Sequence, residues 1–288
     1  MLHAWLRTYG STDPLAHAPP APRALRAARP APVVRPPTHL VFGDSHAAPD
    51  QDLGRFRAMG AIVRAEADRA AAEGRALVVV QIGDWYSFDS LCEHETAAKR
   101  SEGTVRAEIE AGELALEAFH AGAGAASIAA LGDHVTAYVT EGNHDKRVAA
   151  LADDAPWLDG LYTVGAAHEA RGWGWVPFLR PLRRDGVRYQ HYLTSRGGAR
   201  AIGGVNHART MLARVHYGES VVVGHSHALA YHTEASHLGV RRHSIVVGAW
   251  LDHVEEYARE DNQGWWTGHV VLRGVVDGDA ESVEFHRR

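Results

Sequence analysis

Short runs of apolar, β-branched residues alternate with longer amphipathic stretches from Thr38 onward. Four of these runs read THLVFG, ALVVVQIG, HVTAYVTEG and ESVVVG, and each of them ends in glycine. Short continuous apolar runs bounded by glycine are typical of strands that are buried on both faces. We therefore expect these four segments to be strands of buried sheets.

The segments between the runs have the spacing of helices. Between the first two runs, apolar side chains recur at helical intervals, at Leu53, Phe56, Val63, Ala67 and Ala70. Gly74 follows them, and glycine commonly ends a helix. The Ala- and Glu-rich segment 96–130 is also predicted to be helical. Strands that alternate with helices indicate a layered α/β core.

After Gly172 the pattern changes to shorter segments, among them GVRYQHYL, RRHSIVVGAW and GHVVLRGVV, with one helix-like piece at 206–215. This pattern of short apolar segments predicts a second, partly antiparallel sheet that packs on the first. The expected fold class is therefore α/β, with two mixed sheets flanked by helices.

The first 37 residues differ from the rest of the chain. Eight of the twelve prolines lie there, among alanines and arginines, and Asp13 is the only acid. Such a composition cannot build a core, so residues 1–37 are predicted to form an extended or disordered arm, with a cleaved, Arg-rich targeting peptide as the alternative. Residues 38–288 are predicted to form the folded domain.

Composition narrows the function classes. The formal charge of −5, from 30 basic and 35 acidic residues, gives no broad attraction to nucleic acid or to anionic membranes. The single cysteine, Cys92, excludes an internal disulfide and a Cys-rich zinc module. No apolar stretch approaches the roughly 20 residues that span a bilayer, so no membrane association and a cytoplasmic location, in a host or bacterial cytosol, are expected. The 20 histidines prompt a search for metal-ligand spacing.

Polar clusters follow the apolar runs directly. They comprise Asp44 and His46, then Asp84, then Asn143, His144 and Asp145, and finally His225 and His227. Ligands of layered α/β folds bind beyond the carboxyl ends of the strands, where all four clusters are expected. Asp133 and His134 stand at the start of a run instead, so they are predicted at the opposite edge. Each cluster alone is explained by a turn, a helix cap or a surface pair. Four clusters that all follow the carboxyl end of a predicted strand, however, predict a shared site.

The residue types of the clusters suit divalent cations. Carboxylate, imidazole and amide groups fit Mn²⁺, Fe²⁺, Zn²⁺ or Ni²⁺, and a carboxylate such as Asp84 can touch two ions at once. Glycine stands before each cluster, and we expect it to let the backbone turn sharply into the site.

The motifs GDSH at 43–46, GD at 83–84, GNHD at 142–145 and GHSH at 224–227 resemble those of the calcineurin-like metallophosphoesterases, especially the phage and bacterial branch. The resemblance extends from about Thr38 to at least Val247, and it implies a layered αββα sandwich. It further implies an isolated histidine before the last motif. His191 has the expected spacing, 34 residues before His225, although Tyr192 stands where the family has glycine; His207 and His216 are the alternatives.

The resemblance implies an enzyme with two divalent ions, Mn²⁺ foremost. One ion would be held by Asp44, His46 and His227 and the other by Asn143, His191 and His225, with Asp84 between them. A hydroxide bridging the ions would attack a phosphoester, and His144 would protonate the leaving oxygen or stabilise its charge. Asp145 would orient its neighbours or cap a helix. Lys146 and Arg147 would hold substrate phosphate or form a solvated helix face.

Two other functions fit the same motifs. The site could cleave DNA or RNA, with the basic arm in contact with phosphates, or the protein could be a metal-binding scaffold without turnover. The region from Trp85 to about Ala130, with the aromatic residues Trp85, Tyr86 and Phe88, is interpreted as a cover that faces the substrate, with helix packing as the alternative for Phe88 and Leu91. The substrate itself and the oligomeric state are not encoded in these patterns.

Overall fold

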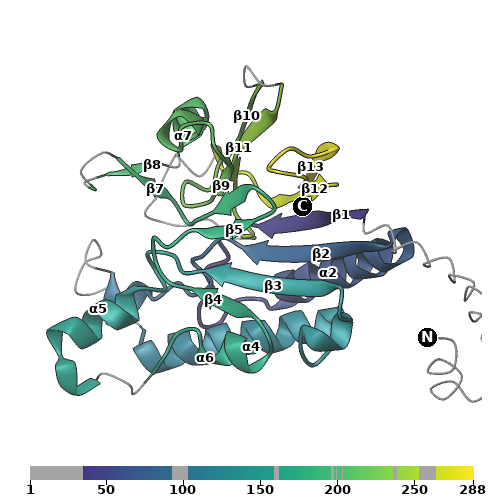
Figure 1. Ribbon diagram of the computed structural model, residues 1–288. Coiled ribbons are helices and arrows are strands. Elements are labelled where there is room, and N and C mark those ends of the chain that lie inside the picture. The colour runs from purple at the N-terminus through teal and green to yellow at the C-terminus, as the bar shows by residue number, and fades with distance from the viewer. Residues whose placement is uncertain are drawn as a thin grey trace, which may run out of the picture. The chain divides into compact units, whose positions relative to one another are not determined.

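The structure is a computed structural model that describes residues 35–92, 103–158, 162–195, 198, 200–202, 204–235, 239–252 and 264–288. The predicted arm lies outside the described residues except for residues 35–37, which already belong to the first strand. The fold is α/β, as expected, with two mixed sheets and helices beside them (Figure 1).

The first sheet has six strands in the order β13-β12-β1-β2-β3-β4. Their bounds are β1 Arg35–Phe42, β2 Arg75–Gln81, β3 Val135–Thr140, β4 Gly174–Val176, β12 Gly268–Arg273 and β13 Ser282–Arg287. The strands β1 to β4 run parallel, so their carboxyl ends meet at one edge. Asp133 and His134 precede β3, which places them at the other edge as predicted.

The second sheet has five strands in the order β10-β11-β9-β6-β5. Their bounds are β5 Leu182–Arg184, β6 Val187–Tyr189, β9 Ser220–Val223, β10 Leu229–Ala235 and β11 Arg241–Val247. The strand β9 is parallel to both β6 and β11, whereas β5 and β10 are antiparallel to their neighbours. A separate pair joins β7 Leu193–Thr194 to β8 Ala201–Ile202.

The assignment of GHVVLRGVV to the second sheet is wrong. Its strand β12 lies antiparallel to β1 in the first sheet, with His39 opposite Leu272. Alternate side chains of β12 are buried on both faces: Val271 packs in the helix-covered core, and Val270 in the core that also includes strands of the second sheet. A strand with two apolar faces fits beside β1 as well as in the second sheet, so its pattern alone could not choose.

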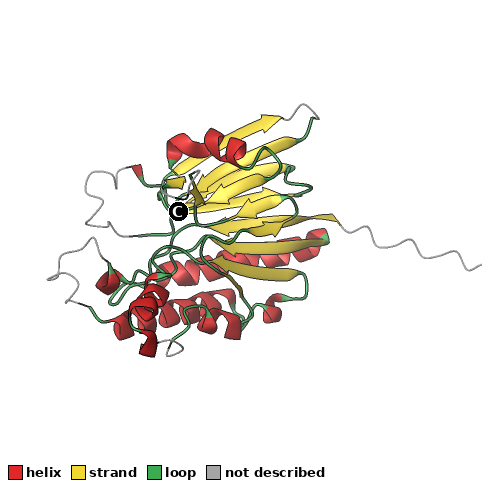
Figure 2. Ribbon diagram, turned by 60° about the vertical axis from the view of Figure 1, so that its left-hand side comes forward, coloured by secondary structure: helices red, strands yellow, loops and turns green. Residues whose placement is uncertain are grey.

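Helices cover the outer face of each sheet. The helices α2 Gly54–Glu73 and α4 Val105–Ala123 pack on the first sheet through a core that includes Phe56 and Phe119. On the second sheet, α7 Ala208–Arg214 packs through Met211 and Leu212. Two short helices, α5 Arg147–Asp154 and α6 Ala166–Ala170, follow β3. Figure 2 shows the strands between the helix layers.

The two sheets face each other across a second apolar core, which combines Val41, Val78 and Val80 of the first sheet with Val222, Ile245 and Val247 of the second. Leu40 and Phe42 of β1 point the other way, toward α2 and α4. Because β1 is buried on both faces, its apolar run is continuous rather than alternating.

The segment after β2 packs inward rather than over a substrate. Trp85, Tyr86 and Phe88 have no exposed surface and belong to the core under α2 and α4. The interpretation of these side chains as a substrate cover is therefore wrong, and packing explains them. Among the described residues, no helix is long and apolar enough to cross a membrane.

Candidate metal centre

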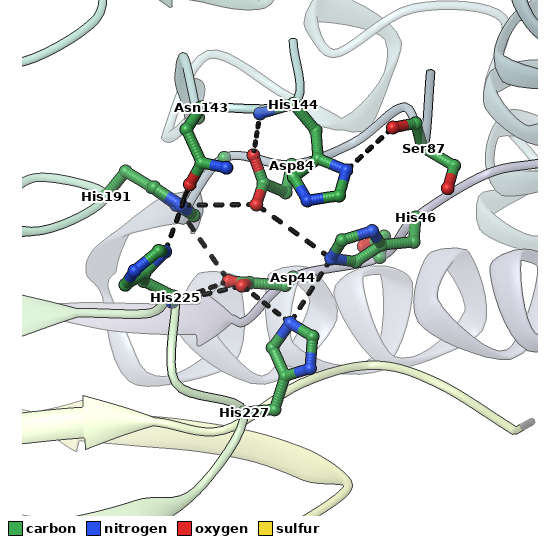
Figure 3. Close-up of polar contacts among 12 residues, drawn as sticks. Asp44, His46, Asp84, Ser87, Asn143, His144, His191, His225 and His227 are labelled. Carbon is green, nitrogen blue, oxygen red and sulfur yellow. Dashed lines mark hydrogen bonds and ion pairs between the residues drawn. The ribbon is translucent and has the colours of Figure 1, made fainter. Parts of the chain in front are cut away.

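The carboxyl ends of five strands deliver polar side chains to one place. Asp44 and His46 follow β1, Asp84 follows β2, Asn143 follows β3, His191 follows β6, and His225 and His227 follow β9. Figure 3 shows these seven side chains directed toward a common centre. Most of them are almost completely buried; His225 and Asn143 are partly accessible. The seven predicted ligands thus lie together in the structure.

One group of ligand atoms comes from Asp44, His46 and His227. The Nε2 atom of His227 lies 3.0 Å from Asp44 Oδ2 and 3.2 Å from His46 Nε2. All three ligand atoms lie within 4.8 Å of one another, a spacing that allows one cation to contact all of them. This is the predicted set for the first ion.

A second group of ligand atoms comes from Asp84, His191 and His225, again within 4.8 Å of one another. The oxygen Oδ1 of Asn143 joins it, at 2.9 Å from His191 Nε2 and 3.0 Å from His225 Nδ1. His191, and neither His207 nor His216, therefore occupies the place of the isolated histidine. His207 instead accepts a hydrogen bond from the amide of Gly204 next to α7.

Asp84 lies between the two groups. Its Oδ2 atom is 3.9 Å from His46 Nε2 and 3.2 Å from His191 Nε2. Its Oδ1 atom accepts the backbone N–H of His144 at 2.8 Å, which fixes the carboxylate so that the other oxygen faces both groups. Asp44 is fixed in the same way, because both of its oxygens lie 3.0–3.1 Å from the backbone nitrogen of His225.

The surroundings of the His191 ring favour a positive charge at its Nε2 atom. Its Nδ1 lies 2.8 Å from the carbonyl oxygen of Ile82, so Nδ1 carries a proton and donates it. The other nitrogen, Nε2, faces the oxygens of Asn143 and Asp84. Burial opposes charge on this ring, but the carboxylates of Asp84 and Asp44 outweigh burial and raise the pKa of His191 to about 10. Oxygens around Nε2 thus require either a proton or a cation there.

Three further ligands, His46, His225 and Asp84, are held in the states that bind cations. Burial, aided by His144 and His227, lowers the pKa of His46 well below its ordinary value. Burial and the positive charge of His191 lower the pKa of His225 to about 4. Burial would raise the pKa of the Asp84 carboxyl, but the charge of His191 and its hydrogen bond to the carboxylate outweigh burial and hold that pKa well below the ordinary value. Neutral imidazoles and ionised carboxylates are metal ligands.

The motif glycines serve mainly to make room. A Cβ atom on Gly142 would lie 2.0 Å from Asp84 Oδ1, and one on Gly224 would lie 2.3 Å from Asp44 Oδ1. Both glycines thus allow a carboxylate of the neighbouring strand end to approach the backbone. The expectation of a sharp glycine turn before each cluster holds only at Gly83, whose φ is +76°.

Four of the candidate ligands themselves have positive φ angles. His46, Asp84, His225 and His227 have φ values of 44°, 49°, 74° and 56°. Residues other than glycine rarely adopt such values, which cost on the order of 1 kcal/mol or more each and cluster at functional sites. Folding of the surrounding strands therefore stabilises a strained arrangement that aims these four side chains inward.

His144 lies beside the ligands, with its ring centroid 4.4 Å from that of His46. Its Nδ1 donates to the carbonyl oxygen of Ser87 at 2.7 Å, and burial lowers its pKa, so the neutral ring presents an unprotonated Nε2. Arg147 Nη2 lies 3.3 Å from that nitrogen and donates to it. The sequence did not indicate Ser87, because its contribution is a backbone carbonyl that any residue could supply.

The neighbours of His144 stabilise the loops of the site. Asp145 accepts the amide N–H groups of Tyr86 and Gly142 at 3.0 and 2.9 Å, which ties the Asp84 loop to the Asn143 loop. It caps no helix, because α5 begins at Arg147 without a side-chain cap. Arg147 donates to the carbonyls of Ser87 and Phe88, so it is not on a solvated helix face.

Because His168 has no motif context, its sequence predicts a surface residue or a hydrogen-bonded sheet residue, and the structure shows neither. It is completely buried on α6, and neither ring nitrogen has a hydrogen-bond partner in the described part of the chain. Trp85 and Trp175 surround it at centroid distances of 4.9 and 5.3 Å. His168 contributes nothing to the groups of ligand atoms.

Comparison of the chain with models of known protein families gives no match, and a search among curated proteins gives none either. The case for a function therefore rests on the residues of this chain and their geometry.

Proposed function

We propose that the protein is a phosphoester hydrolase that uses two divalent metal ions, of the kind represented by the calcineurin-like metallophosphoesterases. The layered arrangement of the sheets and helices and the four glycine-containing motifs support the resemblance. Mn²⁺ is the first candidate ion, and Fe, Zn and Ni suit the same donors.

One observation carries the proposal. Two groups of imidazole and carboxylate atoms flank Asp84, whose Oδ2 atom lies 3.9 Å from His46 Nε2 of the first group and 3.2 Å from His191 Nε2 of the second. A single structural ion needs only one such group, whereas two ions a few ångströms apart, as in two-metal phosphatases and nucleases, need a shared carboxylate between them.

When bound, two divalent cations supply a hydroxide nucleophile near neutral pH and neutralise charge on a phosphoryl group. Asp44, His46 and His227 would hold one cation, while Asn143, His191 and His225 would hold the other. Asp84 would contribute to both positions. The backbone amides of His144 and His225 hold the two carboxylates in place before substrate arrives, so little reorganisation is needed.

His144 would act on the leaving group. Its Nε2 is unprotonated in the free protein, so it takes up a proton only when a negatively charged substrate raises its pKa. In the free protein Arg147 holds the ring in place through its contacts with Nε2 and with the loop that contains Ser87. Its contact with Nε2 is released when that nitrogen takes up a proton from water, because a protonated nitrogen accepts no hydrogen bond. The proton on Nε2 then passes to the departing oxygen.

The test is hydrolysis of bis(4-nitrophenyl) phosphate by chelated protein after addition of Mn²⁺, with His144→Gln as the diagnostic variant. We expect metal-dependent turnover, and a loss of about 10²–10⁴-fold in His144→Gln, which is the range for a general acid or base. Calorimetry should still show two bound ions in this variant. The exposed His286→Gln serves as the matched control and should retain full activity.

Two results would contradict the proposal. Activity that persists in excess chelator would exclude a role for the metals. Binding of two ions without turnover of any phosphoester would instead support a metal-binding scaffold, the remaining function of a different class.

A further inference from the structure

The second sheet carries a concentration of positive charge that the net charge of the chain conceals. Between residues 180 and 219 the described basic side chains are all arginines, namely Arg180, Arg183, Arg184, Arg188, Arg200, Arg209 and Arg214. The only acids in this stretch are Asp185 and Glu219. The chain as a whole has a formal charge of −5, so this part of the molecule is a basic region on an acidic protein.

A polar pocket of about 170 Å³ lies within the basic region. Arg188 and Arg214 line it, together with Leu179, Gln190, Leu193, Thr194 and Val215. Gln190 and Leu193 lie on either side of His191 and Tyr192, at the carboxyl end of β6, so the pocket adjoins a strand end that contributes to the candidate metal centre. A water molecule takes up about 30 Å³ in the liquid, so the pocket has room for a phosphate group.

The side chains of the pocket are held in position. The Nε and Nη2 atoms of Arg188 donate to Gln190 Oε1 at 3.1 and 3.0 Å. The Nε atom of Arg214 donates to the carbonyl oxygen of Thr194 at 3.1 Å. Both guanidinium groups are therefore partly fixed, which lowers the entropy that an anion must overcome to be bound by them.

The charges at the pocket are unbalanced. Arg183 and Arg188 are cross-strand partners, and both form ion pairs with Glu219. Two arginines thus share one carboxylate, and Arg214 is close enough to Arg188 to repel it. Burial, with the repulsion of Arg183 and Arg214, lowers the pKa of Arg188. An anion in the pocket would relieve this repulsion, and guanidinium groups bind phosphate in a two-pronged fashion.

We propose that the pocket between Arg188 and Arg214 binds a second phosphate group of the substrate, beyond the phosphoester at the metal centre. The inference rests on the proposed function for the first phosphate. Gln190, which lines the pocket, directly precedes His191, which contributes to the candidate metal centre. The substrate then carries at least two phosphates, either along a nucleic-acid strand or within a small molecule of several phosphates.

The first experiment measures selectivity among substrates. Hydrolysis in Mn²⁺ is compared for bis(4-nitrophenyl) phosphate, a single-stranded oligonucleotide and a dinucleoside tetraphosphate, with the wild type and the double variant Arg188→Gln/Arg214→Gln. We expect kcat/KM of the variant to fall at least tenfold more on a substrate with several phosphates than on the single-phosphate diester. A loss confined to the oligonucleotide identifies a nucleic-acid substrate, and a loss confined to the tetraphosphate identifies a small molecule.

The second experiment measures binding without turnover. Fluorescence anisotropy of a labelled single-stranded oligonucleotide, in excess chelator, gives the affinity and its dependence on salt, and displacement by the dinucleoside tetraphosphate gives the affinity of the small molecule. We expect binding of at least one ligand to weaken at least tenfold in the double variant, and the salt slope to decrease by roughly 0.7 for each phosphate contact that is lost on a single strand. Arg57→Gln is the control, because Arg57 is exposed on α2, in the helix layer on the first sheet.

The two proposals fail in different ways. If the wild type hydrolyses none of the three compounds, the proposed function fails, while the binding measurement still tests the pocket. The pocket is refuted if the double variant binds both ligands as tightly as the wild type does, or if Arg57→Gln weakens binding equally.

Discussion

The close approach of Gly224 to Asp44 provides the sharpest test of the candidate metal centre. A Cβ atom at position 224 would lie 2.3 Å from Asp44 Oδ1, whereas an ordinary contact begins near 3.4 Å. In Gly224→Ala the carboxylate must therefore retreat by about 1 Å to reach a normal van der Waals separation. The new methyl group has little room to move away from the carboxylate instead, because Ile82 Cγ2 lies only 3.0 Å from the same Cβ position.

The retreat of Asp44 has two consequences. Its contacts of 3.0 Å with His227 Nε2 and 3.0–3.1 Å with the His225 amide lengthen beyond hydrogen-bonding distance. Overpacking costs about 1–3 kcal/mol of unfolding free energy, and the lost hydrogen bonds to a charged group add to this cost. The carboxylate also leaves the first group of ligand atoms, so we expect Mn²⁺ affinity to fall at least tenfold.

Urea unfolding in excess chelator and again in Mn²⁺ separates these effects. At a Mn²⁺ concentration 100 times the wild-type Kd, one bound ion adds about 2.7 kcal/mol to the unfolding free energy, and a tenfold weaker site adds only about 1.4 kcal/mol. Gly218→Ala is the matched control. Gly218 lies in the loop before β9, and a Cβ atom there has its nearest described neighbour, the carbonyl oxygen of Val215, at 3.4 Å.

The reasoning is refuted if Gly224→Ala retains the full stabilisation by Mn²⁺. It is also refuted if Gly218→Ala loses as much of that stabilisation, because the effect would then come from the added methyl group and not from the displaced carboxylate.

Two further predictions follow from buried histidines. Because the pKa of His191 is raised to about 10, it carries a proton at pH 7.5, and a cation bound at Nε2 must displace that proton. Calorimetry of Mn²⁺ binding in buffers of different ionisation enthalpy should show release of about one proton more in the wild type than in His191→Gln, and equal release in both proteins would contradict the assignment. Burial lowers the pKa of His168 to about 3, so its folded-state pKa lies below the unfolded value of about 6.5, and stability present above pH 6.5 is lost as the pH falls toward 3. His168→Leu removes two unpartnered nitrogens and should raise the unfolding free energy by about 1–2 kcal/mol at pH 7, with a larger gain at pH 5; thermal unfolding at both pH values checks this, and destabilisation at pH 7 would show that the imidazole is needed for packing.

Local sequence predicted two helices of the fold closely. The helix expected up to Gly74 is α2, which ends at Glu73 with Gly74 in the left-handed conformation. The predicted helix near 206–215 corresponds to α7 and the turn before it. These elements depend on side-chain periodicity and on glycine at a helix end, both of which are local properties of the chain.

The candidate ligands could be selected from sequence for a similar reason. Each follows an apolar run directly, and parallel strands bring their carboxyl ends to one edge, so Asp44, Asp84 and Asn143 were expected to meet without knowledge of the coordinates. His191 was selected over His207 and His216 because the family resemblance implies a histidine at this spacing from His225, and the structure places His191 at 3.2 Å from Asp84.

Other features of the molecule depend on contacts between segments far apart in the chain. The sequence alone determined which residues form buried strands, where helices end and which polar groups follow each strand. Only the tertiary structure decided that β12 pairs with β1, that Trp85 and Tyr86 are buried under helices, and that Gly142 and Gly224 make room for carboxylates rather than for a turn. The physical reason is that local sequence does not encode these contacts. A β strand with two apolar faces can pair with several other strands, and an aromatic ring or a glycine can occupy several environments. The segment that packs against each of them decides which one it adopts.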